Sequence, residues 1–161
     1  MKAILRTGFL ALAIVLAQSV PANAGPYEDG IEAAERGDYA TALKLWRPLA
    51  EQGIGEVQYN LGIMYDNGWG VPPSYTVAVK WYRDAAEQGN PFAQHDLAFM
   101  YAAGTGVAQD FVRAYMWLNV AVASGNSLMV KHLNSIADKL NSTQVEEAQK
   151  MARRWMENHR K

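Results

Sequence analysis

Two absences limit what this chain can do. The sequence contains no cysteine, and its 15 Lys+Arg and 16 Asp+Glu residues nearly cancel, which leaves a net charge of −1. Without cysteine, disulfides, thiolate zinc sites and cysteine nucleophiles are excluded. A nucleic-acid binder needs a basic face, so we expect no nucleic-acid partner. Because 50% of the residues are apolar, the composition favours a folded chain over a disordered one.

The sequence also lacks the common catalytic motifs. It contains no G-x-S-x-G, S-x-x-K, H-E-x-x-H or P-loop pattern. The three histidines, His95, His132 and His159, fall in three separate expected helices and do not have the spacing of metal ligands. His95 and Asp96 are adjacent, and we expect their side chains to point away from each other on a helix. The sequence therefore predicts a non-enzymatic protein without a metal or a cofactor.

The first 24 residues have the three parts of a secretory signal peptide. Lys2 and Arg6 form a positive start, residues 9–17 are continuously apolar, and the end carries an A-x-A cleavage pattern at 22–24. An uncleaved membrane anchor is the alternative, but the apolar run is shorter than the roughly 20 residues that span a bilayer. We therefore predict cleavage after Ala24, a secreted or periplasmic protein, and no membrane segment in the mature chain.

A repeat of 36 residues organises the rest of the chain. Segments 55–90 and 91–126 align without a gap, with Leu, Tyr, Gly, Ala and Trp recurring at the same positions. In the first segment Leu61, Met64 and Tyr65 stand at i, i+3 and i+4, which is one face of a helix. Each unit is thus predicted to be a helix, a glycine-rich turn and a second helix.

Polar and glycine residues mark where these helices begin and end. Asn90 is placed as an N-cap before a proline, and Ser74 and Asp110 are placed to cap the second helices of the two units. Gly68 and Gly104 are placed to end the first helices. The pattern continues more weakly outward and includes a capping box that starts at residue 141, before a last helix that runs to about residue 159. We expect 127–140 to be one further first helix.

The repeated pattern resembles the Sel1-like repeat, a relative of the tetratricopeptide repeat. The resemblance rests on A/V-Q-x-x-L-G/A-x-x-Y-x-x-G-x-G-V in the first half of each unit and A-x-x-W-Y/L-x-x-A-A/V-x-x-G-N in the second. Ala98 and Leu118 depart from the usual Gly and Tyr. The resemblance implies an α/α solenoid used for protein–protein contact, and secreted bacterial members include envelope scaffolds and inhibitors of sensor kinases. Some cysteine-rich relatives are associated with β-lactam hydrolysis. This chain has neither their cysteines nor an identifiable nucleophile, so we do not expect that activity here.

The predicted fold is all-α, a right-handed α/α solenoid of about four helix pairs. Its parts are a signal peptide (1–24), a tetratricopeptide-like helix pair (25–54), two Sel1-like repeats (55–90 and 91–126) and a C-terminal capping helix pair (127–161). We expect a monomer whose concave groove, lined by the first helices, binds a protein or peptide that the sequence does not identify. By analogy with tetratricopeptide geometry, the groove residues are Tyr59, Ile63, Asn67, His95, Phe99 and Lys131.

Two questions stay open at this point. Ile63 and Phe99 are apolar helix residues, so each could belong to the core instead of the groove. Trp69 lies in a turn where the next unit has Thr105, so packing does not require it and it is a possible further partner contact. The other four tryptophans are expected in the core. Trp69 and export together raise a second hypothesis, a protein associated with peptidoglycan or carbohydrate, and a hydrolase of unidentified type is a third.

Overall fold

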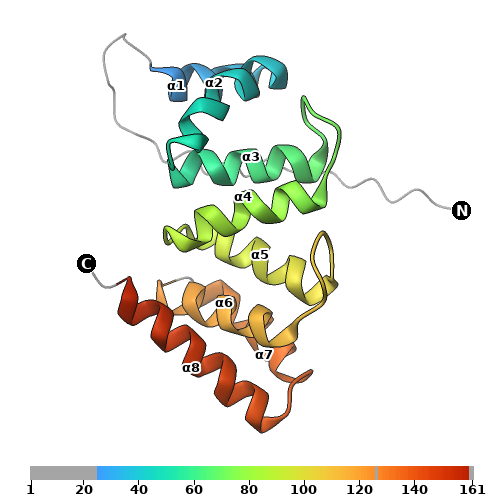
Figure 1. The fold of residues 1–161 in the computed structure, drawn as a ribbon, viewed down its shortest axis with the longest axis vertical. Helices are drawn as coiled ribbons and strands as arrows, with labels where there is room; N and C mark the ends of the chain where they lie inside the picture. The colour runs from blue at the N-terminus through green and yellow to red at the C-terminus, as the bar shows by residue number, and fades with distance from the viewer. Residues whose placement is uncertain (1–24, 126, 160–161) are drawn as a thin grey trace, which may run out of the picture.

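The structure is a computed structural model that describes residues 25–125 and 127–159, and within these ranges it contains α-helices and no strand (Figure 1). The predicted signal peptide and its cleavage site after Ala24 lie outside the described residues. The α-helices in chain order are α1 (Pro26–Glu35), α2 (Tyr39–Glu51), α3 (Gly55–Asn67), α4 (Tyr75–Glu87), α5 (Pro91–Ala103), α6 (Phe111–Ala123), α7 (Val130–Ala137) and α8 (Ser142–Asn158).

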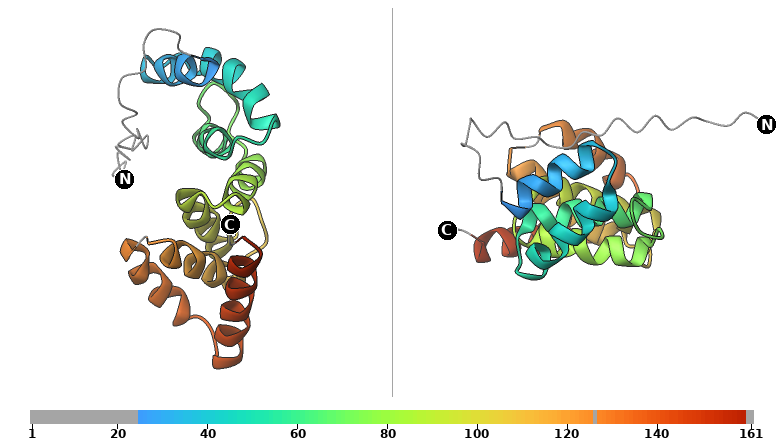
Figure 2. Two further views of the ribbon diagram at one scale, coloured as in Figure 1. Left: turned by 90° about the vertical axis from the view of Figure 1, so that its left-hand side faces the viewer. Right: turned by 90° about the horizontal axis from the view of Figure 1, so that it is seen from above.

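The helices stack as pairs along a curved array, which confirms the predicted all-α solenoid. The first helices of the units, α1, α3, α5 and α7, lie along the inner side of the curve (Figure 2, left). Helices α2, α4 and α8 lie on the outer side, and α6 contacts α5, α7 and α8. We call the side of α1, α3, α5 and α7 the inner surface.

The predicted caps are confirmed at both repeats. The side chains of Ser74 and Asp110 accept hydrogen bonds from backbone N–H groups at the starts of α4 and α6. Asn90 caps α5 by accepting two backbone N–H groups at 3.0 and 2.9 Å. Gly68 and Gly104 end α3 and α5 with φ of 71° and 68°, a left-handed conformation in which a glycine has no Cβ penalty. These local signals set the length of each helix.

A small residue on the first helix of each pair faces a large residue on the second. A Cβ added to Gly62 of α3 would overlap the ring of Tyr82 on α4, and a Cβ added to Gly30 of α1 would overlap Trp46 on α2. In the third pair the corresponding residues are Ala98 and Leu118. The two departures from the usual repeat pattern are therefore coupled, because the added methyl group leaves no room for a tyrosine ring.

Neighbouring units are joined by hydrogen bonds that recur with the repeat. Gln58 of α3 is buried and donates through Nε2 to the carbonyl of Ala50 in α2, at 3.0 Å. Gln94 of α5 makes the same bond to the carbonyl of Ala86 in α4, at 3.2 Å. Two arginine–tyrosine bonds repeat in the same way, Arg47 Nη2 to Tyr65 Oη at 2.9 Å and Arg83 Nη2 to Tyr101 Oη at 3.0 Å. The glutamine of the repeat motif therefore links one unit to the next.

The last unit is less regular than the sequence predicts. In place of one helix over 127–140, the chain forms a 3-10 turn, η1 (Ser127–Met129), followed by the short helix α7. The N-cap of α7 is Met129, which supplies no side-chain hydrogen bond, and α7 buries none of its residues. The capping box at Asn141 is confirmed, and it starts α8, which packs along α6.

The prediction that four tryptophans lie in the core holds for two of them. Trp46 and Trp117 are buried. Trp81 and Trp155 are only partly buried, because the outer face of their helices is open to solvent. The indole N–H of Trp155 donates to Glu87 Oε2 at 2.7 Å, so this ring joins α8 to the end of α4.

Candidate partner-binding surface

A stripe of aromatic and ionisable residues follows the inner side of α5. Phe92, His95, Asp96 and Phe99 stand at i, i+3, i+4 and i+7, which places them on one face of the helix. The side chains of Phe92 and Phe99 are 45% and 43% exposed, although both are large and apolar. For Phe99 this answers the question that the sequence left open, since it belongs to the surface and not to the core.

Tyr59 of α3 extends this stripe to the preceding unit. Its ring stacks on Phe92, with centroids 6.0 Å apart and planes inclined by 27°. Its hydroxyl donates to Asp96 Oδ2 at 3.1 Å. Burial raises the pKa of the Tyr59 hydroxyl, and the nearby charges of Asp96 and Asp66 raise it further. The predicted groove residues Tyr59, His95 and Phe99 are thus brought onto one continuous surface.

The stripe ends at a cluster of three rings between α5 and α7. His95 lies 4.6 Å from Phe99 and 5.4 Å from His132 between ring centroids. The rings of Phe99 and His132 meet edge-on, 5.0 Å apart and inclined by 85°. Nε2 of His95 and Nδ1 of His132 are buried without a hydrogen-bond partner among the described residues. The cluster therefore exposes an aromatic face next to unpaired ring nitrogens.

The sequence missed His132 and selected its neighbour Lys131. Counting 36 residues from His95 leads to Lys131, but η1 precedes α7 and the last unit does not follow the regular register. The ring contacts of His95 go to His132, and Lys131 is exposed near the start of α7. Asn67 is also exposed, at the end of α3, where its side chain donates to the carbonyl of Ile63 at 2.9 Å. Neither Lys131 nor Asn67 takes part in the described ring contacts.

The expectation that His95 and Asp96 point away from each other is wrong. Nδ1 of His95 lies 2.8 Å from Asp96 Oδ1. Both side chains bend toward the inner surface, and Asp96 also accepts the hydroxyl of Tyr59. Asp96 thus holds two aromatic side chains of the surface in place.

A small cavity lies beside Phe99. Its volume is about 50 Å³, enough for a water molecule or a small side-chain group but not for an organic ligand. It is lined by Ala98, Phe99, Ala102, Leu118, His132, Ser135 and Ile136. In the preceding pair the ring of Tyr82 packs on Gly62. The cavity lies where Leu118 replaces that ring.

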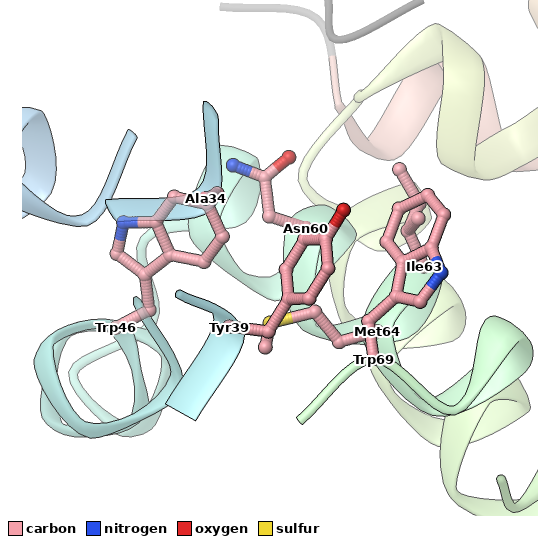
Figure 3. A pocket seen from close by; sticks show the side chains of 7 residues that line it. All are labelled: Ala34, Tyr39, Trp46, Asn60, Ile63, Met64 and Trp69. Atoms are coloured by element: carbon pink, nitrogen blue, oxygen red, sulfur yellow. The ribbon is translucent and has the colours of Figure 1, made fainter. Parts of the chain in front are cut away.

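Trp69 packs within the protein, contrary to the expectation that packing does not require it. Its ring stacks on Tyr39, with centroids 5.1 Å apart and planes inclined by 13°. Both rings line a hollow of about 20 Å³, as does the half-buried Ile63. Figure 3 shows how these side chains lie. In the next unit Thr105 replaces Trp69, and the corresponding Tyr75 is 51% exposed. Trp69 therefore covers a tyrosine that the next unit leaves open.

The described residues hold no arrangement suited to metal chemistry or to crossing a membrane. Across 25–125 and 127–159, no three His, Asp or Glu side chains come together as metal ligands. No helix in the described ranges is long and apolar enough to span a bilayer. The inner surface offers exposed aromatic rings and carboxylates, which are groups that bind a partner.

Comparison with known proteins places this geometry in a family. The model of the Sel1 repeat matches residues 22–54, 55–90 and 91–126. Among curated proteins no match is found. The chain is similar to a solved Sel1 repeat protein from Oxalobacter formigenes, with 34% identity and a TM-score of 0.63 over 68% of this chain and 86% of that one.

A second solved structure shares the fold over a longer part of this chain. It is a protective antigen from uropathogenic Escherichia coli that displays an SLR fold, with 29% identity and a TM-score of 0.77. The match covers 82% of this chain but only 29% of the antigen, so this chain spans less than a third of that protein.

Helix pairs that stack in register along the chain define an α/α-solenoid repeat protein. More specifically, the chain belongs to the Sel1 repeat family. Repeats of this family are commonly protein–protein interaction modules, and their fold is typically a non-enzymatic scaffold.

Proposed function

We propose that this chain is an exported, non-enzymatic adaptor that binds a protein or peptide of the cell envelope on its inner surface. The observation that carries the proposal is the exposure of Phe92 and Phe99, nearly half of each side chain, on a face that continues to Tyr59. Exposed apolar side chains that lie together mark partner sites in soluble proteins. A partner that covered these rings would remove their apolar surface from water, and this burial would favour binding.

Export is supported by the N-terminal sequence. The positive start, the short apolar run and the A-x-A pattern are the features that a signal peptidase recognises. Cell fractionation with an intact-mass measurement tests this part, and we expect a periplasmic or secreted species that lacks residues 1–24. A cytoplasmic species that keeps them would contradict export.

No specific observation favours the other two hypotheses. The hypothesis of peptidoglycan or carbohydrate binding requires that the Trp69 ring be free to contact a sugar, but that ring is stacked on Tyr39. The hydrolase hypothesis requires a nucleophile paired with a positioned base. The described residues of the inner surface offer aromatic rings and carboxylates but no such pair. Binding therefore remains the function that the geometry supports best.

Partner capture with matched variants tests the binding surface. We expect Phe92→Ala and Phe99→Ala to lose the proteins that the natural chain captures from an envelope extract, as identified by mass spectrometry. Tyr75→Ala is the matched control, because it removes an exposed aromatic ring from α4. Circular dichroism should show that all three variants keep their helices. Capture that survives in both phenylalanine variants would place the binding site elsewhere.

A further inference from the structure

Charge is divided between the two kinds of helix in the solenoid. Helices α1, α3 and α5 contain acidic residues and no Lys or Arg, whereas α2, α4 and α6 contain most of the basic residues of the first three pairs. The acidic residues of the first helices are Glu28, Asp29, Glu32, Glu35, Glu56, Asp66 and Asp96. The basic residues of the second helices are Lys44, Arg47, Lys80, Arg83 and Arg113. The second helices also carry Glu51, Asp84 and Glu87, and α7 adds the exposed Lys131 at one end of the inner surface. The acidic layer is therefore formed by α1, α3 and α5.

The carboxylates of this layer lie among the exposed rings. Asp96 is held beside Tyr59 and stands on the same face of α5 as Phe92 and Phe99. Glu56 lies one turn before Tyr59 on α3 and accepts the hydroxyl of Tyr27 of α1 at 3.4 Å. The side chain of Asp96 is 33% exposed, so part of its charge faces solvent. Aromatic faces and negative charges therefore alternate along the part of the inner surface formed by α3 and α5.

We propose that the inner surface is selective for a cationic peptide segment, in which Lys or Arg residues alternate with apolar residues. This inference rests on the proposed function and names the chemistry of its partner. The apolar residues cover Phe92 and Phe99, and the cations meet Glu56 and Asp96. A guanidinium or ammonium group also gains from lying over an aromatic face, and its alkyl stem packs against the ring. An acidic peptide on the same rings would place like charges together, which disfavours it.

Charge complementarity of this kind affects both the selectivity of binding and the rate of association. Partly exposed carboxylates are screened by salt, with a Debye length of about 10 Å at 0.1 M and about 3 Å at 1 M ionic strength. Binding of a cationic segment should therefore weaken as salt rises, whereas contacts to Phe92 and Phe99 persist. The two contributions can be separated because they come from different residues of one helix face.

Labelled synthetic peptides measured by fluorescence anisotropy test the proposal. The probes are an alternating Arg–Leu peptide, the same peptide with Glu for Arg, and the same with Gln for Arg. We expect the full chain to bind the cationic peptide more tightly than the neutral one, and the acidic peptide least. We expect the difference between the cationic and neutral peptides to shrink as salt rises. Equal affinity for the three peptides would overturn the charge selectivity.

Charge variants with a matched control show whether the effect belongs to the inner surface. Asp96→Asn and Glu56→Gln remove charge but keep an oxygen that accepts the bonds from Tyr59 and Tyr27. Each should lower the ratio of the affinity for the cationic peptide to that for the neutral peptide by about two- to fivefold. Asp84→Asn, which removes the same charge from α4, should leave this ratio unchanged. An equal decrease with Asp84→Asn would mean that the peptide senses only net charge, and the proposal would fail.

The failure of this inference is distinguishable from the failure of the proposed function. If Phe92→Ala and Phe99→Ala weaken all three peptides equally while the charge variants have no effect, the surface binds peptides and only the cation selectivity is wrong. If neither kind of variant weakens any peptide, the binding surface itself is wrong. A second copy of this chain is the remaining occupant. A dimer in sedimentation velocity that Phe99→Ala dissociates would assign the surface to self-association and overturn the cationic partner.

Discussion

The ring of Tyr82 on α4 packs directly against the backbone of Gly62 on α3, with no space for a Cβ between them. The third pair replaces both partners, since Ala98 and Leu118 occupy the corresponding positions. A methyl group on the first helix is therefore compatible with a leucine opposite it and not with a tyrosine. Because the two residues meet in a close-packed interior, a change at one alters what the other tolerates.

Gly62→Ala is predicted to destabilise the protein by about 1–3 kcal/mol, because an added methylene in a packed core strains its neighbours. In an open helix position the same change stabilises by about 0.5–1 kcal/mol. Combined with Tyr82→Leu, which recreates the Ala98–Leu118 pair, the cost of the alanine should largely disappear. Urea unfolding of the four members of this double-mutant cycle measures the coupling. Additive single effects would contradict the packing argument.

The substitution Trp69→Thr introduces the residue that the next unit has at this position, Thr105, and removes the ring that covers Tyr39. We predict a loss of about 1–3 kcal/mol in the free energy of unfolding, because a half-buried indole and its stacking contact are removed. Tyr75→Thr is the control, since it removes an exposed ring, and surface changes of this kind usually stay within about 0.5 kcal/mol. Capture of a partner should be unchanged in both. Lost capture with unchanged stability would restore Trp69 as a partner contact.

Much of the fold is predictable from local sequence. The caps at Ser74, Asn90 and Asp110 form as predicted because a side-chain oxygen two or three residues before a free backbone N–H satisfies that group in any tertiary setting. The helix pairs follow from the apolar spacing at Leu61 and from its repetition 36 residues later. These signals depend on neighbours along the chain and not on distant contacts.

The inner surface was harder to predict because it depends on register between units. A count of 36 residues from His95 selects Lys131, and the irregular start of the last unit presents His132 instead. The stacking of Trp69 on Tyr39 joins residues 30 positions apart, and no pattern within one unit reveals it. The contact of His95 with Asp96 depends on how two adjacent side chains bend, which helix geometry alone leaves open.

Stability is predicted to fall at alkaline pH in part through Tyr59. Burial, followed by the charge of Asp96, raises the pKa of its hydroxyl in the folded state. The unfolded chain releases the proton near pH 10, whereas the folded chain retains it, so the stabilisation is complete below about pH 10 and is lost as the pH rises beyond it. The slope contributed by one fully protected tyrosine is at most about 1.4 kcal/mol per pH unit, and residual exposure of Tyr59 lowers it.

Tyr59→Phe should therefore reduce the alkaline loss of stability relative to the natural chain. Urea unfolding between about pH 9 and pH 11.5 measures the difference between the two slopes. At neutral pH the variant should be less stable by about 0.5–1.5 kcal/mol, because the hydrogen bond to Asp96 is lost. Tyr75→Phe removes a hydroxyl from an exposed ring and controls for general effects. Parallel pH curves for the natural chain and Tyr59→Phe would refute the assignment.

The cavity beside Phe99 can be filled by restoring the usual repeat pair. Leu118→Tyr alone should destabilise the protein, because the ring would meet the methyl group of Ala98. In an Ala98→Gly background, the same change should stabilise the protein relative to Ala98→Gly alone, because the ring then has room to pack and can fill part of the hollow of about 50 Å³ beside Phe99. Urea unfolding of the two single variants and the double variant gives both values. If Leu118→Tyr has the same effect in both backgrounds, Ala98 does not decide which residue fits opposite it.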